Sequence, residues 1–151
     1  MSAVSLTGQD DVIINGRVMR DVGDGDWCTL DFESDIANLK VSKDGNTIYA
    51  LNSTGRAVKT TLRVLAGSAD DKFLNSLLTA MKADFSSFSL LSGSFIKRVG
   101  DGAGNISSVV YQLAGGIFKK DIATKGNAEG DVSQSVAVYE LLFKNQGRSI
   151  Q

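Results

Sequence analysis

Two short acidic segments rich in glycine are the first candidates for chemistry. Residues 23–26 read GDGD, and residues 100–105 read GDGAGN. Carboxylates spaced by glycine can ligate a hard cation, and glycine amides can cradle an anion. Neither segment has the D-x-[DN]-x-[DN]-G pattern of a calcium loop or the GK[ST] end of a phosphate loop. We therefore interpret both as tight turns between strands.

Groups for acid–base and nucleophilic catalysis are scarce. The chain has no histidine, and Cys28 is its single cysteine. Asp24 and Asp26 resemble a carboxylate pair for glycoside hydrolysis, but only Trp27 is nearby to offer a sugar platform. We expect no enzymatic activity, no cofactor and no metal.

Trp27 and Cys28 fall in a strand predicted over residues 27–33. Alternation places Cys28 on the same side as Leu30 and Phe32, which favours its burial as a small hydrophobic residue. Trp27 falls on the opposite side, as a core plug at the strand end or as an interface anchor. The sequence leaves both roles open.

The charges of the chain nearly cancel but are unevenly distributed. Lys and Arg number 16 and Asp and Glu 17, so the positive excess typical of nucleic-acid readers is missing. Residues 1–46 hold nine acidic and four basic residues, and the remainder holds eight acidic and twelve basic. This division fits a dipolar subunit whose acidic side meets the basic side of the next copy, an acidic surface that repels a polyanion, or solvated loops.

Most of the residues named above must lie on or between β-strands, because apolar and polar residues alternate mainly with a period of two. Within residues 56–66, Val58 and Leu62 fall on one face and Lys59 on the other. The length of 151 residues predicts one domain. Further strands are predicted at residues 12–14, 27–33, 39–41, 47–51, 88–98, 106–120 and 132–144.

Residues 68–84 predict a single amphipathic helix. Ser68 can cap its first amides, Asp71 completes a capping-box pattern, and Asp70 suits the positive end of the helix dipole. We expect Asp84 to end it. The apolar residues recur at helical spacing along one stripe: Phe73, Leu74, Leu77, Leu78 and Met81.

The last predicted strand has apolar side chains in both of its alternating sets. Val138 and Leu142 belong to one set, and Tyr139 and Leu141 to the other. Both faces should therefore be dry. Either the helix covers the second face within the chain, or a neighbouring subunit does.

The order of several segments resembles the tail tube proteins of tailed bacteriophages, most closely those of contractile tails. These segments are INGR, GDGDW, DGNTIYALNSTG, RVLAG and SADDKFLNSLL. The resemblance implies one tail-tube-like domain over residues 1–151, a mainly antiparallel β-sandwich or barrel flanked by one α-helix. It also implies hexameric rings that stack into the inner tube of the tail and form a channel for DNA.

The same resemblance implies a protruding hairpin at residues 36–55 that contacts neighbouring subunits and rings. We expect this hairpin to be polar and weakly patterned, with no core of its own. Its tip around the Asp-Gly turn carries the predicted inter-subunit contacts: Lys43, Asp44, Gly45, Asn46 and Thr47.

Partners and location follow from the resemblance too. They are further copies of the chain, a tail sheath protein, baseplate or terminator proteins, and duplex DNA as a transient, non-specific cargo. Residues 1–11 lack the features of a signal peptide, and no apolar run approaches the ~18 residues that span a bilayer. We expect assembly in the cytoplasm of a bacterial host, then residence in the virion tail, without a membrane partner.

Duplex DNA carries one negative charge per ~1.7 Å, so a channel wall should avoid exposed lysines. We predict that one polar set on the two long C-terminal strands lines the channel, and that Lys119, Lys120 and Lys144 lie at strand ends. The alternatives are the tube of a phage-tail-like bacteriocin or secretion system, and a monomeric β-sandwich that binds a ligand. The channel candidates are Ser107, Gln112, Ser133, Gln134, Ser135 and Glu140.

Overall fold

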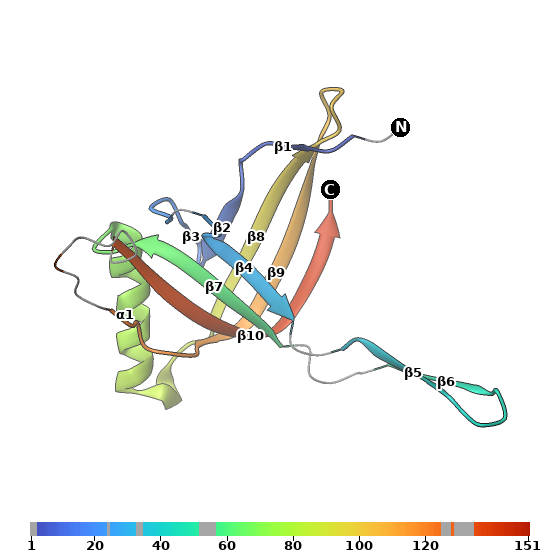
Figure 1. Ribbon diagram of the computed structural model, residues 1–151. Coiled ribbons are helices and arrows are strands. Elements are labelled where there is room, and N and C mark those ends of the chain that lie inside the picture. The colour runs from blue at the N-terminus through green and yellow to red at the C-terminus, as the bar shows by residue number, and fades with distance from the viewer. Residues whose placement is uncertain (1–2, 24, 33–34, 52–56, 125–127, 129–134) are drawn as a thin grey trace.

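The computed structural model describes residues 3–23, 25–32, 35–51, 57–124, 128 and 135–151. Within them the chain is mainly antiparallel β-structure with one α-helix, as predicted (Figure 1). The strands are β1 (Ser5–Leu6), β2 (Asp11–Ile14), β3 (Arg17–Val18), β4 (Cys28–Phe32), β5 (Ala37–Val41), β6 (Thr47–Leu51), β7 (Val58–Leu65), β8 (Leu91–Gly100), β9 (Ile106–Phe118) and β10 (Val136–Ile150). The helix α1 (Ala69–Ala83) is followed by a 3-10 turn, η1 (Phe85–Ser87).

Eight strands form one sheet, ordered β3-β2-β8-β9-β10-β7-β4, with β1 also paired to β8. The sheet curls, so that β4 and β7 pass across β8 and β9 (Figure 1). The long strand β10 spans both halves of the sheet, because Val136 to Phe143 pair with β7 and the strand pairs with β9 as far as Ile150. Strands β5 and β6 pair only with each other and form a separate two-stranded sheet.

The corner between the two halves lies where Gly115 of β9 faces Lys144 of β10. Gly115 has a φ of 67°, and a Cβ built on it would meet the Lys144 Cβ at 3.1 Å. The burial pattern shifts by one residue here, since Gly116 and Leu113 are buried while Ala114 is exposed. Glycine therefore allows the sheet to turn without a clash.

The core fills the inner face of the curled sheet. On β7, Val58, Thr60, Leu62 and Val64 are all fully buried, which confirms the predicted alternation. Tyr139 and other inward residues of β10 face the same core. Leu74 and Leu78 of α1 are buried against it, so the helix covers this face at one end of the sheet (Figure 1).

The helix begins and ends where the sequence predicts. The Ser68 hydroxyl accepts the Asp71 amide at 3.2 Å, and Asp84 is the C-terminal cap. The Asp71 carboxylate accepts the Gly67 amide at 2.8 Å and the Tyr139 hydroxyl at 2.5 Å. Asp71 therefore both caps α1 and links it to β10.

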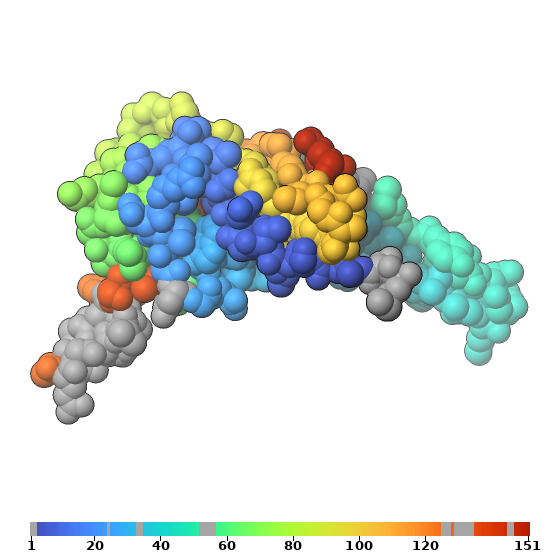
Figure 2. Space-filling model, turned by 90° about the horizontal axis from the view of Figure 1, so that it is seen from above, coloured from blue at the N-terminus to red at the C-terminus, as the bar shows by residue number. Residues whose placement is uncertain are grey.

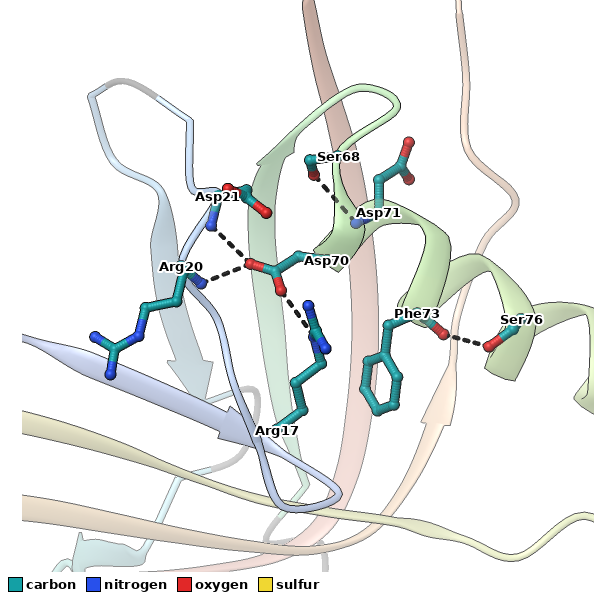
Figure 3. Close-up of polar contacts among 8 residues, drawn as sticks. All are labelled: Arg17, Arg20, Asp21, Ser68, Asp70, Asp71, Phe73 and Ser76. Atoms are coloured by element: carbon teal, nitrogen blue, oxygen red, sulfur yellow. Dashed lines mark hydrogen bonds and ion pairs between the residues drawn. The ribbon is translucent and has the colours of Figure 1, made fainter.

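Asp70, which precedes Asp71 in α1, joins the helix to the β3 segment through a fully buried carboxylate (Figure 3). It accepts the amides of Arg20 at 2.6 Å and Asp21 at 2.7 Å, and the Arg17 Nε at 2.9 Å. Burial alone raises the pKa of Asp70, but these hydrogen bonds and the Arg17 charge outweigh it and hold the pKa below its usual range. The Arg17 guanidinium also lies 5.4 Å from the centre of the Phe73 ring.

The predicted boundaries of two long strands are wrong, and two short strands were missed. Strand β10 continues to Ile150, so Lys144 lies inside the strand and not at its end. The strand predicted from residue 88 begins only at Leu91, after η1 and three residues without regular secondary structure. The short strands β1 and β3 were not predicted, since two residues are too few to show alternation.

The two apolar sets of β10 have different environments. Tyr139 and Leu141 are fully buried beneath α1 and the sheet, whereas Val138 on the other face is 37% exposed and Leu142 is half-buried. The helix therefore covers only one face, and the other remains open to solvent in the single chain.

Candidate assembly surfaces

The ribbon formed by β5 and β6 projects from the body of the domain (Figures 1 and 2). The Ser42 amide donates to the Asn46 carbonyl at 2.7 Å, and the Gly45 amide donates to the Ser42 carbonyl at 3.1 Å. Gly45 has a φ of 84°, which favours glycine in a three-residue hairpin loop. The predicted contact residues Lys43, Asp44, Gly45, Asn46 and Thr47 are all exposed at this tip.

The register gives the ribbon one apolar face. Leu39 pairs with Tyr49, and alternate residues of both strands project on the same side as this pair. The prediction of a weakly patterned polar hairpin is therefore wrong, because the apolar residues of two strands add up on one side. That side carries Ala37, Leu39, Val41, Thr47, Tyr49 and Leu51, and the opposite side carries Asn38, Lys40, Ile48 and Ala50.

An apolar groove of 210 Å³ lies between β4 and the β8–β9 pair, which are not neighbours in the sheet. Phe32 at its side is 51% exposed. The Arg148 guanidinium of β10 lies 5.7 Å from the centre of the Tyr111 ring, and its Nε donates to the Tyr111 hydroxyl at 3.0 Å. Arg148 therefore adds a polar rim to the groove. The groove is lined by Cys28, Leu30, Phe32, Phe95, Lys97 and Tyr111.

Cys28 and Trp27 both pack against the core. Burial raises the pKa of the Cys28 thiol to about 12, so the thiol stays protonated at neutral pH. The prediction that Trp27 faces away from Cys28 is wrong, because Trp27 precedes β4 and its ring lies 6.3 Å from that of Phe95. Trp27 is thus a plug at the strand end.

The outer face of β8, β9 and the second half of β10 is uncharged over its centre. The rings of Phe95 and Tyr111 lie on the inner face with their centres 6.2 Å apart. The residues next to them on β8 and β9 therefore point outward. An ion pair between Arg98 and Asp11, at 2.7 Å, borders this centre, since Asp11 of β2 pairs with Ile96. Cross-strand rows on this face are Ser94, Gln112 and Gly147, then Ile96, Val110 and Ser149.

Glu140 lies on the outer face of the other half of the sheet, among lysines. Its carboxylate is 3.3 Å from the Lys59 Nζ and 3.7 Å from the Lys120 Nζ. Desolvation raises the pKa of Glu140, but the hydrogen bond from Lys59 and the charges of Lys120, Lys59 and Lys119 outweigh it and lower the pKa overall. Glu140 therefore neutralises a basic cluster.

The structure does not bring the channel candidates to one face. Ser107 and Gln112 are five residues apart on β9 and so lie on opposite sides of it. Ser135 is exposed just before β10, where its carbonyl accepts the Ala66 amide at 2.8 Å. Ser133 and Gln134 lie outside the described residues. Lys119 and Lys120 directly follow β9, as predicted.

The acidic turn at residues 100–105 is held by its own hydrogen bonds. The Asp101 carboxylate accepts the Asn105 side chain at 2.8 Å and the Ala103 amide at 2.7 Å, and these bonds lower the pKa of Asp101. Asp24 of the other turn lies outside the described residues. Among the described residues, no three acidic, cysteine or histidine side chains gather as a metal site. Within the same ranges, no helix is long and apolar enough to span a bilayer.

Solved structures with this architecture come from an extracellular contractile injection system. A chain of its PVC sheath/tube terminator in the extended state aligns with a TM-score of 0.61 and 11% identity, over 96% of this chain and 94% of that one. A chain of the PVC sheath-tube complex in the extended state aligns with a TM-score of 0.57 and 9% identity, over 96% and 89%. This chain therefore shares its fold with chains of that contractile injection system.

Comparison with protein-family profiles and with curated protein sequences finds no match. Two features of the surfaces were not predicted from the sequence: the apolar face of the ribbon and the groove. The alternation of Leu39 with Val41 and of Tyr49 with Leu51 was the available signal for the first. The groove depends on how far the sheet curls, for which the sequence carries no local signal.

Proposed function

We propose that this chain is a structural subunit of the inner tube of a contractile tail-like particle. In this proposal, residues 1–151 act as one tube domain that forms hexameric rings, and the rings stack around a channel. The observation that carries the proposal is the fold, which aligns with sheath/tube components of a contractile injection system along 96% of the chain. The role is mechanical and requires no catalytic group.

The outer face of β8, β9 and the second half of β10 is the surface best suited to line the channel. Its rows of Ser94, Gln112 and Gly147 carry no charge, so they neither bind nor repel a phosphate backbone. The lysine cluster around Glu140 is less suited, because it would retain a polyanion. Gln112 is thus the one predicted channel residue that we retain on this face.

The cargo of the channel depends on the kind of particle to which the tube belongs. In a phage, the channel passes duplex DNA from a virion, and sheath, baseplate and terminator proteins are the partners. The aligned structures belong to an extracellular injection system, which favours a phage-tail-like device as the second candidate. An uncharged channel wall is compatible with both kinds of particle.

Self-assembly of the purified chain tests this proposal. Sedimentation velocity over a range of concentrations should reveal discrete oligomers. Negative-stain electron microscopy should reveal rings or hollow rods roughly 100 Å across, the size obtained by closing six domains of this length. A species that remains monomeric at every concentration, also in the presence of its sheath protein, would contradict the proposal and favour a monomeric binding module.

A further inference from the structure

A cavity of 410 Å³ lies between α1, the start of β10 and the segment that follows β9. The Tyr139 hydroxyl of β10 donates to the Asp71 carboxylate of α1 at 2.5 Å, and Lys82 of α1 forms an ion pair with Asp121 at 2.8 Å. Ile122 packs against the core. These contacts fix the walls of the cavity, and its volume falls within the ~300–1,000 Å³ of most small-molecule sites.

Three polar side chains on the cavity wall have no hydrogen-bond or ionic partner in the part of the chain that the structure describes. Lys72 and Asn75 lie about one turn apart on α1, and Thr124 lines the cavity from the segment after β9. All three residues are exposed. Their donors and acceptors are therefore available to a ligand without the loss of a contact within the protein.

The cavity wall carries one charge of each sign. Figure 3 shows the Asp71 side chain directed away from Asp70 and its partners. The Asp71 carboxylate accepts the Gly67 amide and the Tyr139 hydroxyl, and a carboxylate has about four lone-pair sites, so it can accept further donors. Lys72 supplies the positive charge. Both charges are therefore available to the opposite charges of one ligand.

Most of the remaining lining is apolar, with Val136 and Ala137 of β10 facing Ile122. We propose that the cavity binds an aliphatic zwitterion, which is either a free aliphatic amino acid or a short peptide. Its ammonium group pairs with Asp71, and its carboxylate pairs with Lys72 and accepts from Asn75. Its aliphatic side chain packs against Val136 and Ile122.

The two charges of the wall decide between classes of ligand. A purely anionic ligand would meet the like charge of Asp71, and a purely cationic ligand would meet that of Lys72. A zwitterion pairs with both residues. The site shares no residue with the ribbon or with the outer face of β8 and β9, so it is independent of the tube proposal.

A ligand-observed NMR titration of the full chain tests the requirement for two charges. L-Leucine should bind saturably with a Kd of about 1 mM or tighter. The analogue 3-methylbutylamine lacks the carboxylate of leucine, and 4-methylpentanoate lacks its ammonium group. Each analogue should bind about fivefold more weakly than leucine. Equal affinity for all three probes would show adhesion to the apolar lining alone and would overturn the proposal.

Lys72→Met provides a matched test on the protein, because it keeps the aliphatic stem and removes the charge. It should weaken leucine binding about fivefold and should not weaken binding of 3-methylbutylamine, which has no carboxylate for Lys72 to hold. Lys40→Met, at an exposed lysine of β5, is the control and should leave the leucine affinity unchanged. Unchanged leucine affinity in Lys72→Met, or equal weakening of both probes in a variant that is folded by circular dichroism, would overturn the proposal.

L-Leucyl-L-alanine distinguishes the two sources of the zwitterion. The charges of this dipeptide are farther apart than those of leucine, so the two affinities report which spacing suits Asp71 and Lys72. Tighter binding of leucine would assign the site to free amino acids, and tighter binding of the dipeptide would assign it to short peptides; both results support the proposal. Failure of both probes to saturate the chain up to about 20 mM would overturn it.

Discussion

Asp70 shows how one buried carboxylate can fix the position of a helix relative to a strand. Its oxygens accept two backbone amides and the Arg17 side chain, and none of these groups has another acceptor of comparable geometry in the described hydrogen bonds. The sequence indicated only that Asp70 suits the positive end of α1. Its partners lie about fifty residues away in the chain, so no local pattern could predict them.

Asp70→Ala should lower the free energy of unfolding by about 3 kcal/mol, because the backbone amides of Arg20 and Asp21 lose their acceptor and Arg17 loses its ion pair. Asp70→Asn keeps an acceptor oxygen and should cost less. Urea unfolding followed by circular dichroism measures both. An Asp70→Ala chain as stable as the unmodified one would show that the clamp contributes nothing to stability.

The lowered pKa of Asp70 also predicts a pH dependence. Its usual value is 3.8, and a folded value below this means that the carboxylate stabilises the fold fully above pH ~5. The contribution is lost as the pH falls through the folded pKa. The stability difference between the unmodified chain and Asp70→Asn should therefore shrink between pH 5 and pH 2, and a constant difference would contradict the assignment.

Strand β7 and helix α1 were predictable as elements because their patterns are local. The alternation of Val58 and Leu62 and the helical stripe of Leu74 and Leu78 lie within continuous segments. The last residues of β10 were not predictable, because Asn145 to Ile150 are mostly polar and pair as a strand only with β9. The face of the ribbon likewise depends on the register between two strands.

Leu74→Ala should destabilise the domain by about 3 kcal/mol, since it opens a cavity where α1 meets the sheet. Ala80→Asp is the control, because Ala80 is exposed on the same helix and its substitution should cost less than about 1 kcal/mol. Thermal melts compare the two variants. Similar melting temperatures would mean that the buried stripe of α1 is misassigned.

Removing the ribbon tip should affect assembly more than folding. Deletion of residues 43–47 removes exposed residues that pair with no strand of the eight-stranded sheet, so we expect a melting temperature within a few degrees of the unmodified chain. Size-exclusion chromatography should show a loss of oligomers. A fall of more than about 10 °C would show instead that the ribbon supports the core.

The distribution of charge over the molecule determines whether the assembled particle binds duplex DNA. Glu140 neutralises part of a cluster formed by Lys59, Lys119 and Lys120. We expect assembled particles of the unmodified chain to show no measurable affinity for duplex DNA at physiological salt. Glu140→Lys should introduce a salt-dependent affinity, because it converts the cluster into a continuous basic patch.

Asp44→Lys is the control for charge, since it makes the same change at the ribbon tip, away from the cluster. It should bind DNA more weakly than Glu140→Lys. Electrophoretic mobility at several salt concentrations measures both. Tight, salt-sensitive binding by the unmodified chain would indicate a nucleoprotein role and not a conduit.

Reconstruction of the assembled protein by cryo-electron microscopy tests the central claim most directly. We predict six-fold rings stacked around a hollow channel, with Ser94, Gln112 and Ser149 on the channel wall. The claim would be contradicted by an assembly without a channel, or by rings that place the lysine cluster around Glu140 on the inner wall.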